Sequence, residues 1–211
     1  METEVNEVYG ELISNIMLPP KSYNNPFIIA MCGHVGSGKS IVAKTLSNVL
    51  SIYILGGDKI RNIYYFDKNA NHDINHINKV VNEVTKMEIK YLIDNKVSIV
   101  LDRSVSSKNA LEDLKKLCDN IIMINLISDH KINIERITNK KEYNIDTSNC
   151  FGDVDSKSGV CTEEVYNDIL KRKVYDLDNS VFDYEIDTTK SIDLVIEQTK
   201  QIAEEIKKQY L

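Results

Sequence analysis

The residues best suited to chemistry form a glycine-rich run from Gly33 to Ser40, with the sequence GHVGSGKS. The run fits the spacing G-x-x-x-x-G-K-[ST], in which glycines allow a tight turn and consecutive backbone amides converge on anionic oxygens. In this pattern the lysine reaches the β- and γ-phosphates of a nucleoside triphosphate, and the hydroxyl that follows it binds Mg²⁺. The run therefore predicts a P-loop, with Lys39 on the phosphates and Ser40 on the metal.

A second pair of reactive side chains follows the short apolar run 52–55. Asp58 and Arg61 lie three residues apart, so at the start of a helix both would face the same side. A carboxylate beside a triphosphate would orient the hydroxyl of an acceptor molecule and take its proton. A guanidinium would bind a phosphate on the acceptor or spread the charge of the transferring group. We therefore expect Asp58 to be the general base and Arg61 to be a catalytic cation.

A third candidate residue follows the apolar run 97–101. Asp102 stands where a Walker-B carboxylate would hold the Mg²⁺ shell, so Ser40 and Asp102 form the predicted metal site. Arg103 comes directly after it. The sequence leaves open whether this arginine pairs with Asp102 or touches the acceptor.

Short apolar runs alternate with longer helical patterns along the chain, which is typical of a parallel sheet covered by helices. The expected strands are 27–32, 52–55, 97–101, 121–127 and 182–186. The expected helices after the P-loop are 40–50, 75–94, 109–118, 129–139, 162–174 and 192–209. We therefore predict an α/β fold with a doubly wound, parallel, five-stranded sheet that binds its ligand at the carboxyl ends of the strands.

The organisation outside this pattern is simple. Residues 1–26 combine an amphipathic helix with a linker that holds all three prolines of the chain, and residues 27–211 form the P-loop domain. Within that domain, residues 140–161 are polar and have no clear period, so we expect a mobile lid there. The N-terminal helix must bury its apolar stripe on the same domain or on another subunit.

Composition excludes several classes of function. The 26 basic and 32 acidic side chains give a net charge of −6, so a broad surface for nucleic acid is not expected. No apolar run is long enough to span a membrane and the N-terminus is acidic, which indicates neither secretion nor a membrane partner. The four cysteines show no dense framework, so we expect reduced thiols and a cytoplasmic protein.

The motifs at 33–40 and 58–61, with the apolar run that leads to Asp102, resemble those of a known family over roughly residues 27–201. It comprises small P-loop kinases that include the 5′-hydroxyl kinase domain of phage-type polynucleotide kinase and the zeta-toxin-like kinases. The resemblance implies that Asp58 is the general base, that Arg61 lies near the acceptor phosphate or the transferring phosphoryl group, and that Arg136 is the lid arginine. Lys140 replaces a second lid arginine, and lysine lacks the planar fork of arginine.

Motifs and resemblance together predict a kinase that uses ATP and Mg²⁺. The expected catalytic residues are Lys39, Asp58, Arg61 and Arg136. The expected nucleotide-binding residues are Gly33, Val35, Gly36, Ser37, Gly38, Lys39, Ser40, Ile41 and Arg136.

The sequence does not identify the acceptor of the phosphoryl group. A hydroxyl on a small metabolite or a nucleotide suits the acidic balance of the chain. The 5′-hydroxyl end of a nucleic acid and a nucleoside monophosphate are the alternatives within the kinase class. A nucleotide-dependent ATPase switch is the alternative from a different class, and it would hydrolyse ATP without an acceptor and bind a partner through the N-terminal helix.

Overall fold

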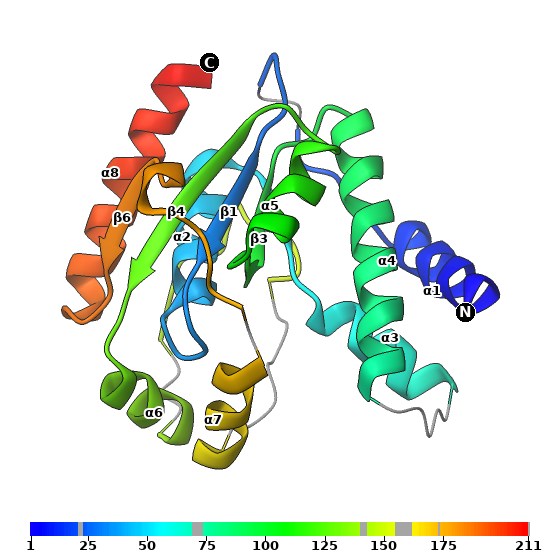
Figure 1. Cartoon of the computed structure of the whole chain (residues 1–211). Coiled ribbons are helices and arrows are strands. Elements are labelled where there is room, and N and C mark those ends of the chain that lie inside the picture. The colour runs from blue at the N-terminus through cyan, green and yellow to red at the C-terminus, as the bar shows by residue number, and fades with distance from the viewer. Residues whose placement is uncertain (21–22, 69–73, 140–142, 155–161, 173, 211) are drawn as a thin grey trace.

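The computed structural model of the chain describes residues 1–20, 23–68, 74–139, 143–154, 162–172 and 174–210. A six-stranded sheet lies at its centre, with the strand order β5-β2-β3-β1-β4-β6 (Figure 1). The strands are β1 (Ile28–Cys32), β2 (Tyr53–Leu55), β3 (Ile99–Ser104), β4 (Ile121–Ile127), β5 (Phe151–Gly152) and β6 (Tyr184–Asp187). Every neighbouring pair is parallel, so the carboxyl ends of all six strands lie at the same end of the sheet.

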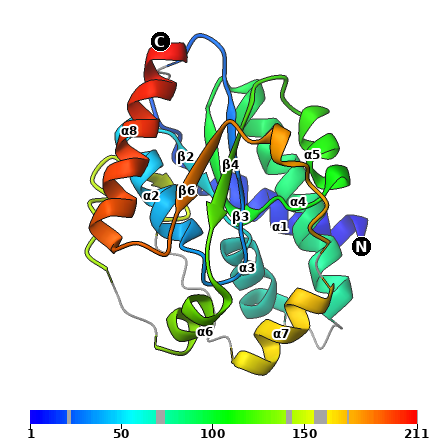
Figure 2. The same cartoon turned by 60° about the vertical axis from the view of Figure 1, so that its left-hand side comes forward.

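Helices cover both faces of the sheet because the central strands are apolar on both faces. Ile29 and Met31 of β1 are buried in one core with α2 (Lys39–Leu50) and α8 (Ile192–Tyr210). Ile28 and Ala30, which alternate with them, are buried in a second core with α4 (Ile74–Asp94) and α5 (Lys108–Lys115). Figure 2 shows the two pairs of helices on opposite sides of the sheet. This arrangement confirms the predicted α/β class.

The N-terminal helix α1 (Glu2–Ser14) lies beside α4 and packs against α3 (Asp58–Lys68) as well (Figure 1). Val8 and Leu12 of α1 are buried in one cluster with Ile60 and Tyr64 of α3 and Val80 of α4. The apolar stripe of α1 is therefore covered within the same molecule. Through this cluster α1 supports the helix that begins at Asp58.

The sheet contains one strand more than the five that we predicted. Phe151 and Gly152 form β5 and pair with Tyr53 and Ile54 of β2. They fall inside the expected lid 140–161, so this part of the segment is an edge strand and not a flap. Gly152 has a φ of +88°, and a Cβ on it would lie 2.2 Å from the carbonyl oxygen of Ile54. A two-residue strand is too short to produce an alternating pattern, which is why the sequence did not reveal it.

Two short helices stand near the carboxyl end of the sheet, α6 (His130–Thr138) and α7 (Glu163–Arg172), and a 3₁₀ turn (Asn179–Val181) precedes β6 (Figure 1). No helix in the described part of the chain is both long and apolar enough to cross a membrane. Cys32, Cys118 and Cys150 are free thiols, and Cys161 lies outside the described residues.

Candidate functional site

The P-loop connects β1 to α2, as its sequence predicts. Gly36 has a φ of +79°, and Gly38, directly before α2, has a φ of +88°. Residues other than glycine rarely adopt this backbone region. A Cβ on Gly36 would also lie 2.6 Å from the backbone oxygen of Asn133 in α6. The two glycines thus allow the loop to curl tightly between the sheet and α6.

Lys39 brings its ammonium group back over the loop. Its Nζ donates to the carbonyl oxygen of His34 at 2.6 Å and to that of Gly33 at 3.1 Å, and it lies 3.4 Å from Oγ of Ser37. The first residue of α2 therefore places a positive charge at the mouth of the loop, where the helix N-terminus also favours an anion.

Ser40 and Asp102 meet across the site although they are far apart in the sequence. Oγ of Ser40 donates to Oδ1 of Asp102 at 3.0 Å. Asp102 lies within β3, which continues beyond the predicted end at residue 101. Burial raises the pKa of Asp102 above its ordinary value, while the hydrogen bond from Ser40 and the charge of Lys39 oppose that shift. A bound cation would stabilise this buried carboxylate, so the pair fits the predicted metal site.

Mg²⁺ in phosphate-binding sites uses few protein ligands and takes the rest from phosphates and water. Consistent with this, the described residues contain no cluster of three or more His, Cys, Asp or Glu side chains that would hold a metal on its own. One carboxylate and one hydroxyl therefore suffice only if the nucleotide supplies further oxygens.

Asp58 and Arg61 form an ion pair at the start of α3. Nη1 of Arg61 donates to Oδ1 of Asp58 at 2.9 Å, and about a third of each side chain is exposed, 33% for Asp58 and 39% for Arg61. The charge of Asp58 adds to the raised pKa of Asp102. The loop, the expected base and the predicted metal site thus follow or lie near the carboxyl ends of the neighbouring parallel strands β1, β2 and β3.

Arg136, in the last turn of α6, flanks the loop on its other side. Its guanidinium donates to the carbonyl oxygen of Gly36 at 3.4 Å and makes a short hydrogen bond to the carbonyl oxygen of Thr188 after β6. It therefore lies beside the P-loop and is bound to backbone oxygens. Lys140 lies outside the described residues, as do positions 141–142 and 155–161 of the expected lid.

The remaining predicted nucleotide-binding residues lie in or next to the loop. Val35 is partly buried in it, and Ile41 belongs to the first turn of α2, where its N–H donates to the carbonyl oxygen of Gly38 at 3.0 Å. His34 stacks near the rings of His130 and Tyr175, at centroid distances of 5.2 and 4.3 Å. His34 thus packs against rings from two later segments of the chain.

The sequence analysis missed Asp153, which anchors the loop that carries Asp58. Its backbone N–H donates to the carbonyl oxygen of Ile54 at 3.0 Å, and its Oδ2 accepts from the N–H of Gly56 at 2.8 Å. Nζ of Lys59 lies 3.9 Å from Oδ1. Gly56 and Lys59 stand on either side of Asp58 in the sequence. By contacting both, Asp153 holds the expected base in position.

We expect the substitution Asp153→Ala to lower the free energy of unfolding by about 1–3 kcal/mol, because it leaves the buried N–H of Gly56 without its acceptor. Asp153→Asn keeps an acceptor oxygen and should cost less. Urea denaturation checks both values, and Asp119→Ala, at an exposed aspartate before β4, is the control expected to stay within about 0.5 kcal/mol of the wild type. Equal stability of the alanine variant and the control would contradict the anchoring role.

A second buried acid lies close to this anchor. Glu88 of α4 is 1% exposed, and its Oε1 accepts a hydrogen bond from the hydroxyl of Tyr53 at 3.2 Å. Its Oε2 is buried and has no hydrogen-bond partner among the described residues. Burial raises the pKa of Glu88 to about 8, with a further increase from the charge of Asp153 and an opposing effect of Lys59. Burial also raises the pKa of Asp153, to about 6.

These shifts predict a stability that falls as the pH rises. The folded state keeps protons that the unfolded state releases near the ordinary values of 4.5 for Glu88 and 3.8 for Asp153, so folding is penalised progressively up to about pH 8. We expect Glu88→Gln to remove much of this decrease in the free energy of unfolding, because the amide stays neutral. The part removed should be on the order of a few kcal/mol. Urea denaturation from about pH 5 to pH 8.5 measures the pH dependence of the free energy of unfolding, and Glu83→Gln, at an exposed glutamate, is the control. Parallel pH profiles of wild type and Glu88→Gln would refute it.

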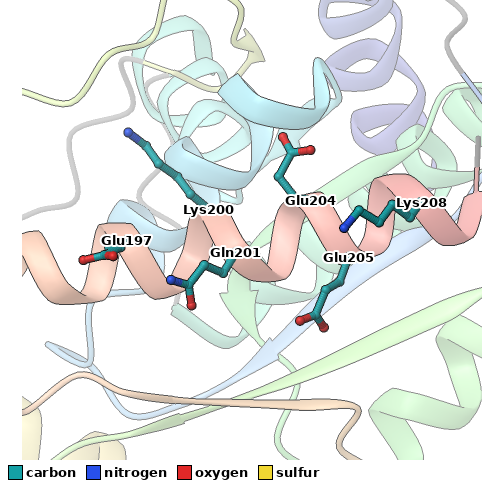
Figure 3. A pocket seen from close by; sticks show the side chains of 6 residues that line it. All are labelled: Glu197, Lys200, Gln201, Glu204, Glu205 and Lys208. Carbon is teal, nitrogen blue, oxygen red and sulfur yellow. The ribbon is translucent and has the colours of Figure 1, made fainter.

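A shallow hollow of about 550 Å³ lies elsewhere, on the outer face of α8. Figure 3 shows its lining side chains, which all come from that one helix: Glu197, Lys200, Gln201, Glu204, Glu205 and Lys208. No predicted site residue reaches it. It is the solvated surface of a helix and has no part in the site.

Comparisons with known proteins bear on the family and the fold of the chain. The sequence profile of the zeta toxin family matches residues 14–121, just over half of the 211-residue chain. The chain is 30% identical over 122 residues to an adenylate kinase of Borrelia duttonii (strain Ly), a match that covers 54% of this chain and 57% of that protein. It is 29% identical over 128 residues to a dephospho-CoA kinase of Borrelia garinii subsp. bavariensis, covering 47% of this chain and 62% of that protein.

The chain thus spans less than two thirds of the length of these curated relatives. Among solved structures, a gluconokinase from Sinorhizobium meliloti 1021 superposes with a TM-score of 0.55 at 12% identity, over 89% of this chain and 95% of that one. At this identity the superposition shows a shared fold only. The family profile covers the P-loop, the Asp58–Arg61 pair and Asp102, and this chain belongs to the zeta toxin family of P-loop kinases.

Proposed function

We propose that this protein transfers the γ-phosphoryl group of ATP to a hydroxyl on a small metabolite or a nucleotide. The observation that carries the proposal is that these groups belong to three neighbouring parallel strands, whose carboxyl ends lie at the same end of the sheet. Lys39 follows the loop after β1, Asp102 of the Ser40–Asp102 pair lies in β3, and the Asp58–Arg61 ion pair follows β2. Phosphoryl transfer needs mainly positioning and charge stabilisation, which this set of groups supplies.

The oxygen atoms of Ser40 and Asp102 indicate which metal ion the site would bind. Ser40 and Asp102 would hold Mg²⁺, which supplies positive charge to the phosphate oxygens and helps to orient them. Lys39, now held by the carbonyl oxygens of Gly33 and His34, would exchange them for oxygens of the β- and γ-phosphates.

Asp58 acts as the general base in this proposal. Its carboxylate takes the proton of the acceptor hydroxyl as the hydroxyl oxygen forms a bond to the γ-phosphorus, and the bond from that phosphorus to the β-phosphate oxygen breaks to release ADP. Arg61, paired to Oδ1 of Asp58, orients the carboxylate. Arg136 would stabilise the transferring group by exchanging the carbonyl oxygens of Gly36 and Thr188 for phosphate oxygens.

A nucleoside monophosphate is the second candidate acceptor. The similarity to an adenylate kinase, at 30% identity over 122 residues, favours it. Both candidates use the same phosphate cradle, but they differ in the attacking group. The phosphate oxygen of a monophosphate is already largely ionised at neutral pH, so Asp58 would have no proton to take from it.

A transfer screen with γ-³²P-labelled ATP tests the proposal. The labelled nucleotide and Mg²⁺ are incubated with the protein and with nucleosides, nucleoside monophosphates, sugars or 5′-hydroxyl oligonucleotides in turn. We expect label on one class of acceptor, together with ADP release that depends on that acceptor. Hydrolysis at the same rate with and without every acceptor would instead assign the protein to the ATPase switches.

A further inference from the structure

His34, the second residue of the P-loop, has a carbonyl group at which two contacts of the loop meet. Its oxygen accepts from the N–H of Ser37 at 3.2 Å, which closes the turn, and from Nζ of Lys39 at 2.6 Å. This is the shortest of the contacts that the Lys39 ammonium makes with Gly33, His34 and Ser37. The position of one peptide group therefore governs both the curl of the loop and the place of its cation.

The side chain of His34 packs against two rings from outside the loop. Its ring centroid lies 4.3 Å from that of Tyr175, in the segment after α7, and 5.2 Å from that of His130, the first residue of α6. Planar rings at such separations attract one another beyond the effect of the area they bury. We call His34, His130 and Tyr175 the ring cluster.

Helix α7 holds the ring of His130 in place. Nδ1 of His130 lies 2.6 Å from the hydroxyl oxygen of Tyr166, a residue of α7 that is fully buried. Nδ2 of Asn133 in α6 donates to the same hydroxyl oxygen at 3.5 Å, and the backbone of Asn133 borders Gly36 of the loop. Figure 1 shows α6 and α7 near one another at the carboxyl end of the sheet. These contacts join α7 to α6, and α6 to the P-loop.

The ring of Tyr175 is fixed through the residue that follows it. Asp176 donates its N–H to the carbonyl oxygen of Ser106 at 3.2 Å, and its Oδ1 accepts from the N–H of Lys108 at 2.8 Å. Ser106 lies between β3 and α5, and Lys108 is the first residue of α5. The segment that carries Tyr175 is thus tied to the connection after β3, and its ring is held against His34 from there.

We propose that His34 is a positioning residue of the kinase and that it acts through Lys39. The ring cluster fixes the peptide group of His34, so its oxygen keeps the turn closed and the ammonium group at the mouth of the loop before the nucleotide binds. A loop that is already ordered binds phosphates more tightly than one that must first be ordered. The inference rests on the proposed kinase function and deepens it, because it gives α7 and the segment after it a part in nucleotide binding.

Titration with ATP and Mg²⁺ measures the effect of the ring cluster on binding. We expect His34→Ala and Tyr175→Leu each to weaken ATP binding by about tenfold, the size expected for the loss of one or two ring contacts. The transfer rate at saturating ATP should fall less than the affinity, because the bound triphosphate orders the loop and takes over Lys39. His34→Phe keeps a planar ring and should recover most of the affinity that His34→Ala loses.

A double-mutant cycle shows whether Tyr175 acts through His34. In the His34→Ala background, Tyr175→Leu should weaken ATP binding by no more than about twofold, since its partner is already absent. Tyr91→Leu is the matched control, because Tyr91 of α4 is also partly buried but packs in the second core. Thermal melting verifies that each variant is folded. Effects that multiply in the double variant, or a His34→Phe protein as weak as His34→Ala, would overturn the inference.

Hydrogen exchange of the Ser37 amide tests the same role without nucleotide. Its N–H donates to the carbonyl oxygen of His34, so loosening of the ring cluster should expose it. In Tyr175→Leu we expect its exchange to accelerate by about tenfold more than that of the buried β1 amides, which report global stability. Unchanged exchange at Ser37 would refute the role of the ring cluster alone. Failure of the kinase function would appear instead in the wild type, as absence of ATP binding or of transfer.

Discussion

The substitution Asp58→Asn should slow phosphoryl transfer by about 10²–10⁴-fold, the range expected when a general base is removed. Asparagine has nearly the shape of aspartate and keeps an oxygen that can accept the hydrogen bond from Arg61, now at 2.9 Å. It cannot take the proton of an acceptor hydroxyl. Lys39 and the Ser40–Asp102 pair are unchanged, so binding of ATP and Mg²⁺ should stay close to that of the wild type.

Two measurements separate these effects. Single-turnover transfer from γ-³²P-labelled ATP gives the rate of the chemical step, and a nucleotide titration gives the affinity. The control is Asp94→Asn, which makes the same change at an exposed aspartate that pairs with Lys90 on α4. A variant that loses nucleotide affinity and rate together would move Asp58 from base to structural residue. A fully active Asp58→Asn protein would exclude it from the chemistry altogether.

A smaller side-chain change probes the geometry of the same group. Asp58→Glu keeps the carboxylate but moves it outward by one methylene, which disturbs both the ion pair with Arg61 and the approach to the acceptor. Because misplacement by about 1 Å can cost about 10²-fold in rate, this variant should be impaired although its charge is intact. The contrast with Asp58→Asn separates the requirement for a charge from the requirement for its position.

Local patterns were enough to predict the framework of the site. The P-loop is encoded by eight consecutive residues, and its glycines are needed for the positive φ angles of Gly36 and Gly38. Asp58 follows one apolar strand and Asp102 lies near the carboxyl end of another, and parallel strands present their carboxyl ends together. Convergence of these residues therefore follows from strand direction alone, once the alternation of strands and helices is recognised.

The anchor of the site could not be predicted in the same way. Asp153 contacts Gly56 across 97 positions of sequence, and it does so from the end of a strand of only two residues. Glu88 lies on a face of α4 that its spacing marks as apolar, and burial of an acid there leaves no local signal. Long-range pairing of polar groups depends on packing of the whole domain, which a single sequence does not display.

Arg103 is a third case, because the sequence left two partners open for its side chain. Its position after Asp102 was compatible with an ion pair to that residue or with contact to the acceptor. The guanidinium reaches α4, where it binds Asn82, and within the described residues it forms no ion pair with Asp102. Neighbours in a strand point to opposite faces, so Asp102 turns toward Ser40 while Arg103 turns toward α4. Period-two alternation thus decides which of the two residues meets Ser40.

Lys39 provides the other large effect, because it is the cation placed closest to the curl of the P-loop. Its ammonium now donates to the carbonyl oxygens of Gly33 and His34, and these contacts hold it at the mouth of the loop. A preorganised cation of this kind stabilises the charge that develops on the transferring phosphoryl group.

We therefore expect Lys39→Ala to lower the transfer rate by about 10²–10³-fold and to weaken ATP binding as well, unlike Asp58→Asn. Lys39→Arg should rescue little, because a planar fork does not replace a compact ammonium group inside the tight loop. The same transfer and titration assays measure both effects, with Lys200→Ala on the outer face of α8 as the control (Figure 3). If Lys39→Ala bound and transferred like that control, the curl of Gly33–Ser40 would not be the phosphate site. If it lost affinity but kept its rate at saturating ATP, the ammonium would act in binding alone and charge stabilisation would have to come from Arg61 and Arg136.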